Sequence, residues 1–170
     1  MDFKLLVTEP NDWRNATADA LLVVVGEGTT PESLGKALGA ALSDALKDGD
    51  LAYKAGRCLY LYRLAGVKAS RVVFAAAADA SVKAFRAAVL AGLSLIKAGG
   101  AKHLLVASAL PQPLGGDQAQ ALLGAVGEGL YVYRHTKPSA PATSKLERVS
   151  LACTVSESAA TREGLIRGQA

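Results

Sequence analysis

The chain has 170 residues and a net charge of +4, and 51% of its residues are hydrophobic against 20% charged. This balance indicates a single globular domain with a substantial core, and it excludes an intrinsically disordered or collagen-like chain. No stretch approaches the roughly 18 apolar residues of a membrane helix, and the Lys and Arg residues are scattered singly, which favours solvated surface charge over a nucleic-acid-binding patch.

The first half of the chain predicts three strands and one helix. Residues 3–8 alternate apolar with polar side chains, and Ala20–Val25 is apolar throughout. A helix is expected to open at Thr29-Thr30-Pro31-Glu32, which supplies a cap, a proline suited to the first turn and an acid near the positive end of the dipole. It should end at Gly49. Cys58–Tyr62 again alternates and predicts a strand.

The next segments predict two strands and two helices. Val72–Ala77 and Leu104–Ala109 are apolar on both faces, as expected of strands covered by helices on both sides. Between them Ser81 should cap a helix that Gly99-Gly100 ends. Its apolar stripe comprises Val82, Phe85, Val89, Leu93 and Ile96. A further helix should open at Asp117.

The C-terminal part predicts a loop, a strand and a last helix. Residues 136–145 contain two prolines among small polar residues and predict a surface loop, and residues 148–155 alternate. From Ser156 onward the pattern is helical, with Ser156 or Ser158 as cap and with Ala159, Ile166 and Ala170 on one face. No closing signal follows Ala170, so we expect the stripe to meet a partner surface further along a longer chain, and a frayed terminus is the alternative.

These elements predict a three-layer α/β domain. Its sheet should be mixed and mostly parallel, with a parallel centre, antiparallel margins and flanking helices. The antiparallel margins are expected because alternating strands suit a sheet with one differently packed face.

The candidate chemistry is sparse, and we assign no catalytic, cofactor-binding or metal-ligating residue. His103 and His135 lack a second ligand at metal spacing. Cys58 and Cys153 are far apart and predict ordinary packing in a reducing compartment. No basic leader region precedes an apolar stretch, so we expect no signal peptide and a cytoplasmic location.

Three constellations leave alternatives open. Ser108, Asp79 and His135 could form a triad, but no nucleophile elbow surrounds Ser108, so a hydroxyl and a carboxylate in turns are favoured. Gly26-Glu27-Gly28 could bind phosphate at a helix start, but a tight turn is favoured because Glu27 would repel an anion. Tyr131–Lys137 could contact nucleic acid, although basic residues at a helix end explain it equally.

Several short segments occur in a recognisable order. They are Ala18-Asp19-Ala20-Leu21-Leu22-Val23-Val24, Lys54-Ala55-Gly56, Leu59-Tyr60-Leu61, Ala65-Gly66-Val67, Arg71-Val72-Val73, the Ala-rich helix from Ser81 to Lys97, the tract from Gly129 to Lys137, and Glu163-Gly164-Leu165-Ile166-Arg167-Gly168. Together they cover essentially the whole chain and resemble the N-terminal domain of leucyl (cytosol) aminopeptidases. The diagnostic catalytic stretch of that family, Asn-Thr-Asp-Ala-Glu-Gly-Arg, and its Lys, Asp and Glu metal ligands are absent here. Ala75–Asp79 departs from a Gly-containing strand end and crowds any small-molecule pocket there.

The resemblance implies a macrodomain-like domain over residues 1–155, with residues 156–170 starting the helix that leads to an absent C-terminal catalytic domain. It implies a parent enzyme that releases N-terminal residues such as Leu from peptides with two divalent metal ions, Mn or Zn, usually as a cytoplasmic hexamer. This part would then be inactive alone, would contribute no metal ligand, and would support assembly and flank the catalytic core.

Two alternatives stand beside this interpretation. One is a free-standing macrodomain-type module that binds nucleotide or ADP-ribose, against which Glu27 and the missing Gly-rich loop argue. The other is a DNA-binding module within the parent, which the weak basicity and the DNA binding of some bacterial relatives allow.

Overall fold

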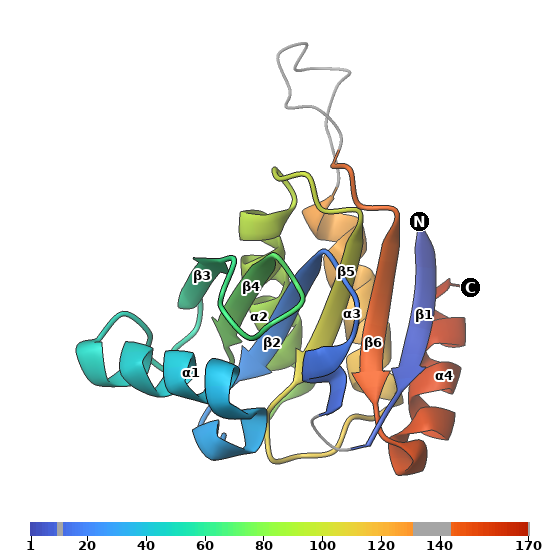
Figure 1. Cartoon of the computed structure of the whole chain (residues 1–170). Coiled ribbons are helices and arrows are strands. Elements are labelled where there is room, and N and C mark those ends of the chain that lie inside the picture. The colour runs from blue at the N-terminus through green and yellow to red at the C-terminus, as the bar shows by residue number, and fades with distance from the viewer. Residues whose placement is uncertain (10–11, 131–143, 170) are drawn as a thin grey trace.

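The computed structural model describes residues 1–9, 12–130 and 144–169, which form a six-stranded sheet with helices on both faces (Figure 1). The strands are β1 (Asp2–Val7), β2 (Ala20–Val25), β3 (Cys58–Tyr62), β4 (Arg71–Ala76), β5 (His103–Ser108) and β6 (Arg148–Cys153). The α-helices are α1 (Lys36–Asp48), α2 (Val82–Ile96), α3 (Gly116–Gly129) and α4 (Val155–Gln169), and two short 3-10 helices are η1 (Asp12–Asn15) and η2 (Pro31–Leu34).

The strands follow the spatial order β1-β6-β5-β2-β4-β3, and among the described strands only β3 is antiparallel to its neighbour. The predicted mixed, mostly parallel sheet is therefore confirmed. The prediction of two antiparallel margins is wrong for β1, which is a parallel edge strand, and β6 lies inside the sheet. Alternation misled there because Ser150 and Ala152, on the polar-looking face of β6, are buried.

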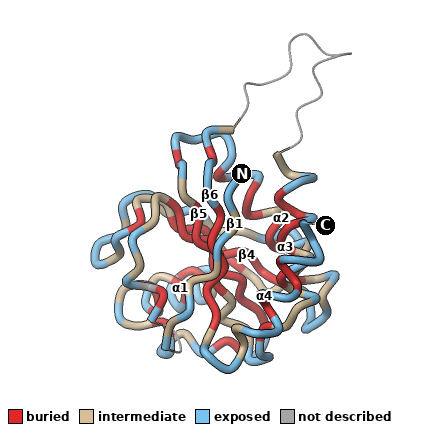
Figure 2. The backbone as a smooth tube through the Cα atoms, turned by 90° about the vertical axis from the view of Figure 1, so that its right-hand side faces the viewer, coloured by how far each residue is buried: buried red, intermediate tan, exposed pale blue. Residues whose placement is uncertain are grey.

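Two apolar cores lie on the two faces of the sheet. The helices α2, α3 and α4 cover one face, where Phe85, Leu122 and Leu165 belong to the larger core. The helix α1 covers part of the other face, where Leu38 and Leu42 join Trp13 in the smaller core. Figure 2 shows the buried strands running through the middle of the molecule between these layers.

The predicted cap of α2 is confirmed, because the Ser81 hydroxyl accepts the backbone N–H of Ala84 at 3.1 Å. The expected single helix from Thr29 to Gly49 is wrong in its first part. Residues 31–34 form the 3-10 helix η2, and Gly35 at φ +88° breaks the chain direction before α1 begins. Thr30 makes no side-chain cap, whereas Gly49 ends α1 in the left-handed conformation as predicted.

The C-terminal helix α4 presents a different face from the one expected. It begins at Val155, so neither Ser156 nor Ser158 is its cap. Its buried residues are Thr161, Gly164 and Leu165, which face α3 and the sheet, whereas Ile166 is 63% exposed. Gly164 permits the close contact with α3 and Leu165 joins the larger core, whereas Ala159 and Ile166 of the expected stripe are exposed.

Some predictions fall outside the described residues. These are His135, most of the 136–145 loop and the tract from Tyr131 to Lys137. Within the ranges that are described, no helix combines the length and the apolar character needed to span a membrane.

Candidate functional site

The carboxyl ends of parallel strands are where open α/β sheets usually bind ligands. After β2 the chain makes the turn that the sequence predicted. The N–H of Thr29 donates to the carbonyl of Gly26 at 2.9 Å, and the N–H of Gly26 donates to the Thr29 hydroxyl at 3.0 Å. That buried hydroxyl donates in turn to the carbonyl of Ala109, also at 3.0 Å. The tight turn is therefore confirmed, and its own threonine occupies the Gly26 amide that an anion would need.

The segment after β5 lies directly on this turn. A methyl group on Gly26 would come within 2.8 Å of the Leu110 side chain, and one on Gly28 within 2.8 Å of Pro111. Both glycines are thus required by a close approach of two loops, rather than by an open cradle for phosphate.

At three helix starts along this edge, backbone N–H groups donate to side chains of the chain itself. Asp79 accepts the N–H of Ser81 ahead of α2, and Gln118 accepts the N–H of Gly115 ahead of α3. Before α4, the Glu157 carboxylate accepts the N–H groups of both Leu114 and Thr154. Such self-capping stabilises the helices and removes N–H groups that could otherwise hold an anionic ligand.

The members of the sequence-suggested triad are not brought together among the described residues. The Ser108 hydroxyl accepts the N–H of Leu110 at 3.2 Å and lines a cavity of about 210 Å³. Asp79 lines a separate cavity of about 270 Å³ beside Glu27. Asp79 lies in the bend before α2, as the favoured interpretation predicted, whereas Ser108 is the last residue of β5 and not a turn residue. His135 lies outside the described residues.

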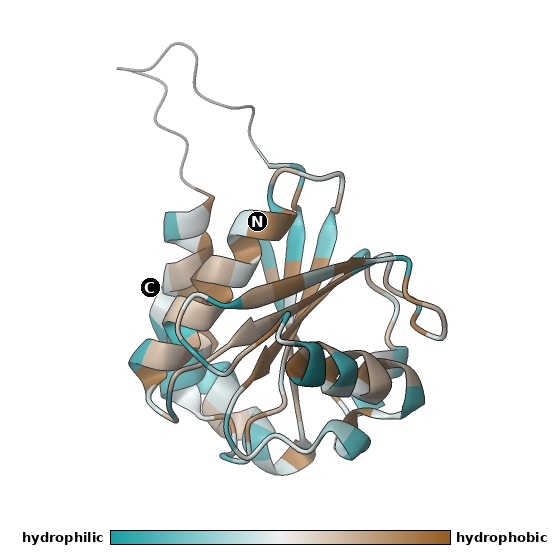
Figure 3. Ribbon diagram, turned by 90° about the vertical axis from the view of Figure 1, so that its left-hand side faces the viewer, coloured by the Kyte–Doolittle hydropathy of each residue, from teal (hydrophilic) through white to brown (hydrophobic). Residues whose placement is uncertain are grey.

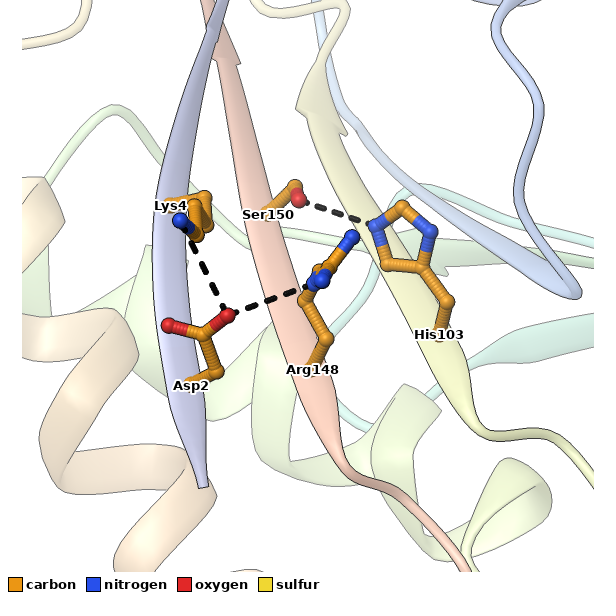
Figure 4. A network of polar contacts seen from close by, with 5 residues as sticks. All are labelled: Asp2, Lys4, His103, Arg148 and Ser150. Carbon is orange, nitrogen blue, oxygen red and sulfur yellow. Dashed lines mark hydrogen bonds and ion pairs between the residues drawn. The ribbon is translucent and has the colours of Figure 1, made fainter.

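At the opposite, amino ends of the strands lies a polar network that sequence reasoning missed (Figure 4). The His103 Nε2 atom is 2.9 Å from the Ser150 hydroxyl, across β5 and β6. Beside them Arg148 pairs with Asp2 at 3.3 Å, and Lys4 lies 4.0 Å from the same carboxylate. The network ties the starts of β1, β6 and β5 together.

Asp19, just before β2, holds the start of β5 through backbone contacts. Its carboxylate accepts the N–H groups of Lys102 at 2.8 Å and His103 at 2.9 Å. These two hydrogen bonds hold the pKa of Asp19 below its usual range. In the sequence, the one indication of this role was the position of Asp19 just before a strand. The sheet register that brings residue 19 to residue 102 is not visible in the sequence.

The electrostatics of His103 favour its neutral form. Burial lowers the pKa of its imidazole, the charge of Arg148 lowers it further, and Asp19 opposes both. A serine beside a neutral imidazole resembles part of a catalytic dyad, but Asp19 binds the backbone N–H of His103 and not its ring. The arrangement therefore joins strands rather than activating a nucleophile.

The two thiols behave as packing residues. Cys153 is buried and Cys58 half-buried, both are free, and burial raises the pKa of each thiol. Neutral, desolvated thiols are poor nucleophiles and poor metal ligands. The predicted packing role of both cysteines is confirmed.

In the part of the chain that the structure describes, no three His, Cys, Asp or Glu side chains are grouped closely enough to hold a metal ion. A cavity of about 560 Å³ lies between α1 and the segment from Ala65 to Val67. Its lining is mostly apolar, with Asn15 and Lys36 as its polar side chains among the described residues.

Comparison with known proteins gives matches over the whole chain. A probable cytosol aminopeptidase of Methylibium petroleiphilum is 47% identical over 170 residues, covering 100% of this chain and 35% of that protein. A probable cytosol aminopeptidase of Polaromonas naphthalenivorans is 39% identical over 156 residues, covering 89% of this chain and 29% of that protein. The cytosol aminopeptidase of Pseudomonas aeruginosa is 30% identical over 180 residues, covering 100% and 36%. No protein-family model matches.

The fold is also similar to a solved structure. A mutant of tomato leucine aminopeptidase superposes with a TM-score of 0.72 at 16% sequence identity, over 99% of this chain and 35% of the tomato chain. This chain therefore spans about a third of the length of the curated relatives and of the solved structure that it matches.

Proposed function

The chain is homologous over its full length to the N-terminal portion of the cytosol aminopeptidases, and from this relationship we propose that it supports an aminopeptidase without carrying its catalytic groups. The observation that carries the proposal is the coverage, because all of this chain matches only about a third of each relative. The parent would release N-terminal residues such as Leu from peptides.

The chemistry of the parent is assigned to the part beyond this match. Two divalent ions, Mn or Zn, would polarise the scissile carbonyl and activate water. The described residues do not fit such ions, because they offer no cluster of three potential ligands. We therefore derive no catalytic step from them.

In this proposal residues 1–155 form the supporting domain and residues 156–170 lead toward the catalytic part. Two exposed apolar side chains on the outer side of α4 support it, because Val155 is 74% and Ile166 63% exposed. Large exposed apolar side chains on one helix face favour burial against another surface. A cytoplasmic parent is proposed from the relatives' name, cytosol aminopeptidase, and a hexameric one from the resemblance to that family.

The alternative of a free nucleotide or ADP-ribose reader has less support. Thr29 occupies the Gly26 amide, and Leu110 covers the turn. A DNA-binding role for the domain rests only on the net charge of +4 and on the analogy with bacterial members of the family. We therefore retain the supporting role within an aminopeptidase as the function.

The test compares the chain alone with a fusion to the remaining portion of the Methylibium petroleiphilum relative. The chain alone should unfold cooperatively but should not hydrolyse leucine p-nitroanilide with added Mn²⁺ or Zn²⁺, whereas the fusion should. Hydrolysis by the chain alone would refute the proposal. A rise in melting temperature with ADP-ribose would favour the reader instead, since binding to the native state raises its stability.

A further inference from the structure

The strand β3 forms one edge of the sheet and pairs only with β4. Within the described residues no strand or helix pairs with its outer side, and Figure 3 looks onto this side of the molecule with helices flanking the sheet. An edge strand presents a row of backbone N–H and C=O groups that can pair with an added strand. The edge of β3 is therefore a ready template for an extended segment.

Aromatic side chains stand beside this open edge. Tyr60 is 39% and Tyr62 is 55% exposed, although β3 also carries Leu59 and Leu61 into the smaller core. Because side chains alternate along a strand, the two tyrosines lie on the same face. Exposed tyrosines next to an unpaired strand edge are typical of surfaces that bind another chain.

Two guanidinium groups lie over the ring of Tyr62. The Arg63 guanidinium carbon is 5.3 Å from the ring centroid, and that of Arg71 is 5.9 Å away. Arg71 is also the residue opposite Tyr62 in the β3–β4 register. Two cation–π contacts therefore hold positive charge at the ring of Tyr62.

The charge of the whole hairpin has one sign. Residues 51–78 contain no Asp or Glu, and their five charged residues are Lys54, Arg57, Arg63, Lys68 and Arg71. None of the five belongs to an ion pair among the residues that the structure describes. Two copies of this edge would repel each other, so edge-to-edge self-association is disfavoured and an acidic occupant is favoured.

We propose that the edge of β3 binds an extended acidic peptide segment, which adds to the sheet as a further strand. The backbone of the segment pairs with β3, and its carboxylates meet Arg57 and Arg63 at the two ends of the strand. Its alternate side chains pack on Tyr60 and Tyr62. Nucleic acid fits this edge less well, because a phosphodiester backbone can accept from the N–H groups of a strand but has no donor for its C=O groups.

The probe is a fluorescein-labelled octapeptide of alternating Glu and Val, with binding followed by fluorescence anisotropy. The double charge reversal of Arg57→Glu with Arg63→Glu should weaken binding by about tenfold, a value typical of two surface charges changing sign. The matched control is Lys4→Glu on β1, the other edge of the sheet, and it should bind as the original chain does. Circular dichroism establishes that each variant is folded.

A second peptide separates strand pairing from simple charge attraction. The same octapeptide with two central Val residues replaced by Pro keeps its charge but loses N–H groups, so it should bind about tenfold more weakly. Equal binding of the two peptides would overturn the proposal. So would a dT12 oligonucleotide that binds more tightly than the peptide and is equally weakened by the Arg57 and Arg63 reversals, because the surface would then be one for nucleic acid.

Discussion

His103 lies at the amino end of β5, with its imidazole against Ser150 and near the charge of Arg148. Its backbone N–H is fixed by Asp19. Burial and the neighbouring guanidinium lower the pKa of this histidine. A group whose pKa is lower in the folded state resists a proton that the unfolded chain accepts. His103 therefore couples the stability of the strand ends to pH.

We expect His103→Gln to flatten the pH dependence of stability between about pH 7 and pH 5. In the original chain the unfolded state gains a proton as the pH falls below about 6.5, while the folded state resists it, so the free energy of unfolding decreases. Asp19 acts in the same direction only at lower pH, because its ordinary pKa is 3.8. Urea unfolding at the two pH values measures the change.

The matched control for this experiment is His135→Gln, which removes the other histidine of the chain. That variant should retain the full pH dependence if His103 is its cause. An unchanged slope in His103→Gln would contradict the prediction.

At the scale of elements, the contact between α3 and α4 depends on glycine. A methyl group on Gly164 would overlap the backbone of Gly116, at the first residue of α3. A methyl group on Gly168 would meet the side chain of Leu123. These close approaches let α4 pack against α3 beside β1, with Thr161, Gly164 and Leu165 buried and Ile166 on the outer side.

We therefore expect Gly164→Ala to destabilise the chain by roughly 1–3 kcal/mol, the usual cost of overpacking. The sign is opposite to that in an open helix, where Gly→Ala stabilises by up to about 1 kcal/mol. Gly127→Ala in α3 is the control, because nothing lies within 4 Å of its added methyl. Urea unfolding measures the free energy of unfolding of both variants. Stabilisation by both substitutions would contradict the prediction, because it would show that the contact between α3 and α4 can relax.

At the scale of the whole molecule, the described residues leave two surfaces uncovered. Both sheet faces carry helices, yet the outer face of α4 and the edge of β3 expose large apolar or aromatic side chains. They lie at opposite ends of the sheet, because β1 beneath α4 is one edge and β3 is the other. One free side suits docking of the catalytic portion, and the other suits an added strand.

The substitution Ile166→Glu tests the first of these sides. In the chain alone it should change stability by less than about 0.5 kcal/mol, because the side chain is exposed. In the fusion with the catalytic portion it should lower thermal stability and activity, since burying an isoleucine contributes about 1.5–3 kcal/mol. Lys83→Glu, an exposed change on α2, should affect neither protein. Equal behaviour of Ile166→Glu in both contexts would contradict docking on this face.

Most elements and the family could be predicted from residue patterns. Apolar runs predicted β2, β4 and β5, because strands buried on both faces are apolar throughout. Ser81 predicted the start of α2, because its hydroxyl accepts an otherwise unpaired backbone N–H. The order of short motifs across the chain led to the aminopeptidase relatives, which comparison then confirmed.

The strand order, the inner face of α4 and the polar network at His103 became visible only in the folded chain. Parallel pairing of β1 with β6 joins residues 146 positions apart, such as Asp2 and Arg148, and local alternation carries no information on such a partner. The same holds for Asp19 and Lys102, whose contact depends on sheet register. In the sequence, Gly164 indicates only a residue of low helix propensity. Its packing role appears with its neighbour Gly116, because close packing is a property of two surfaces and not of one sequence segment.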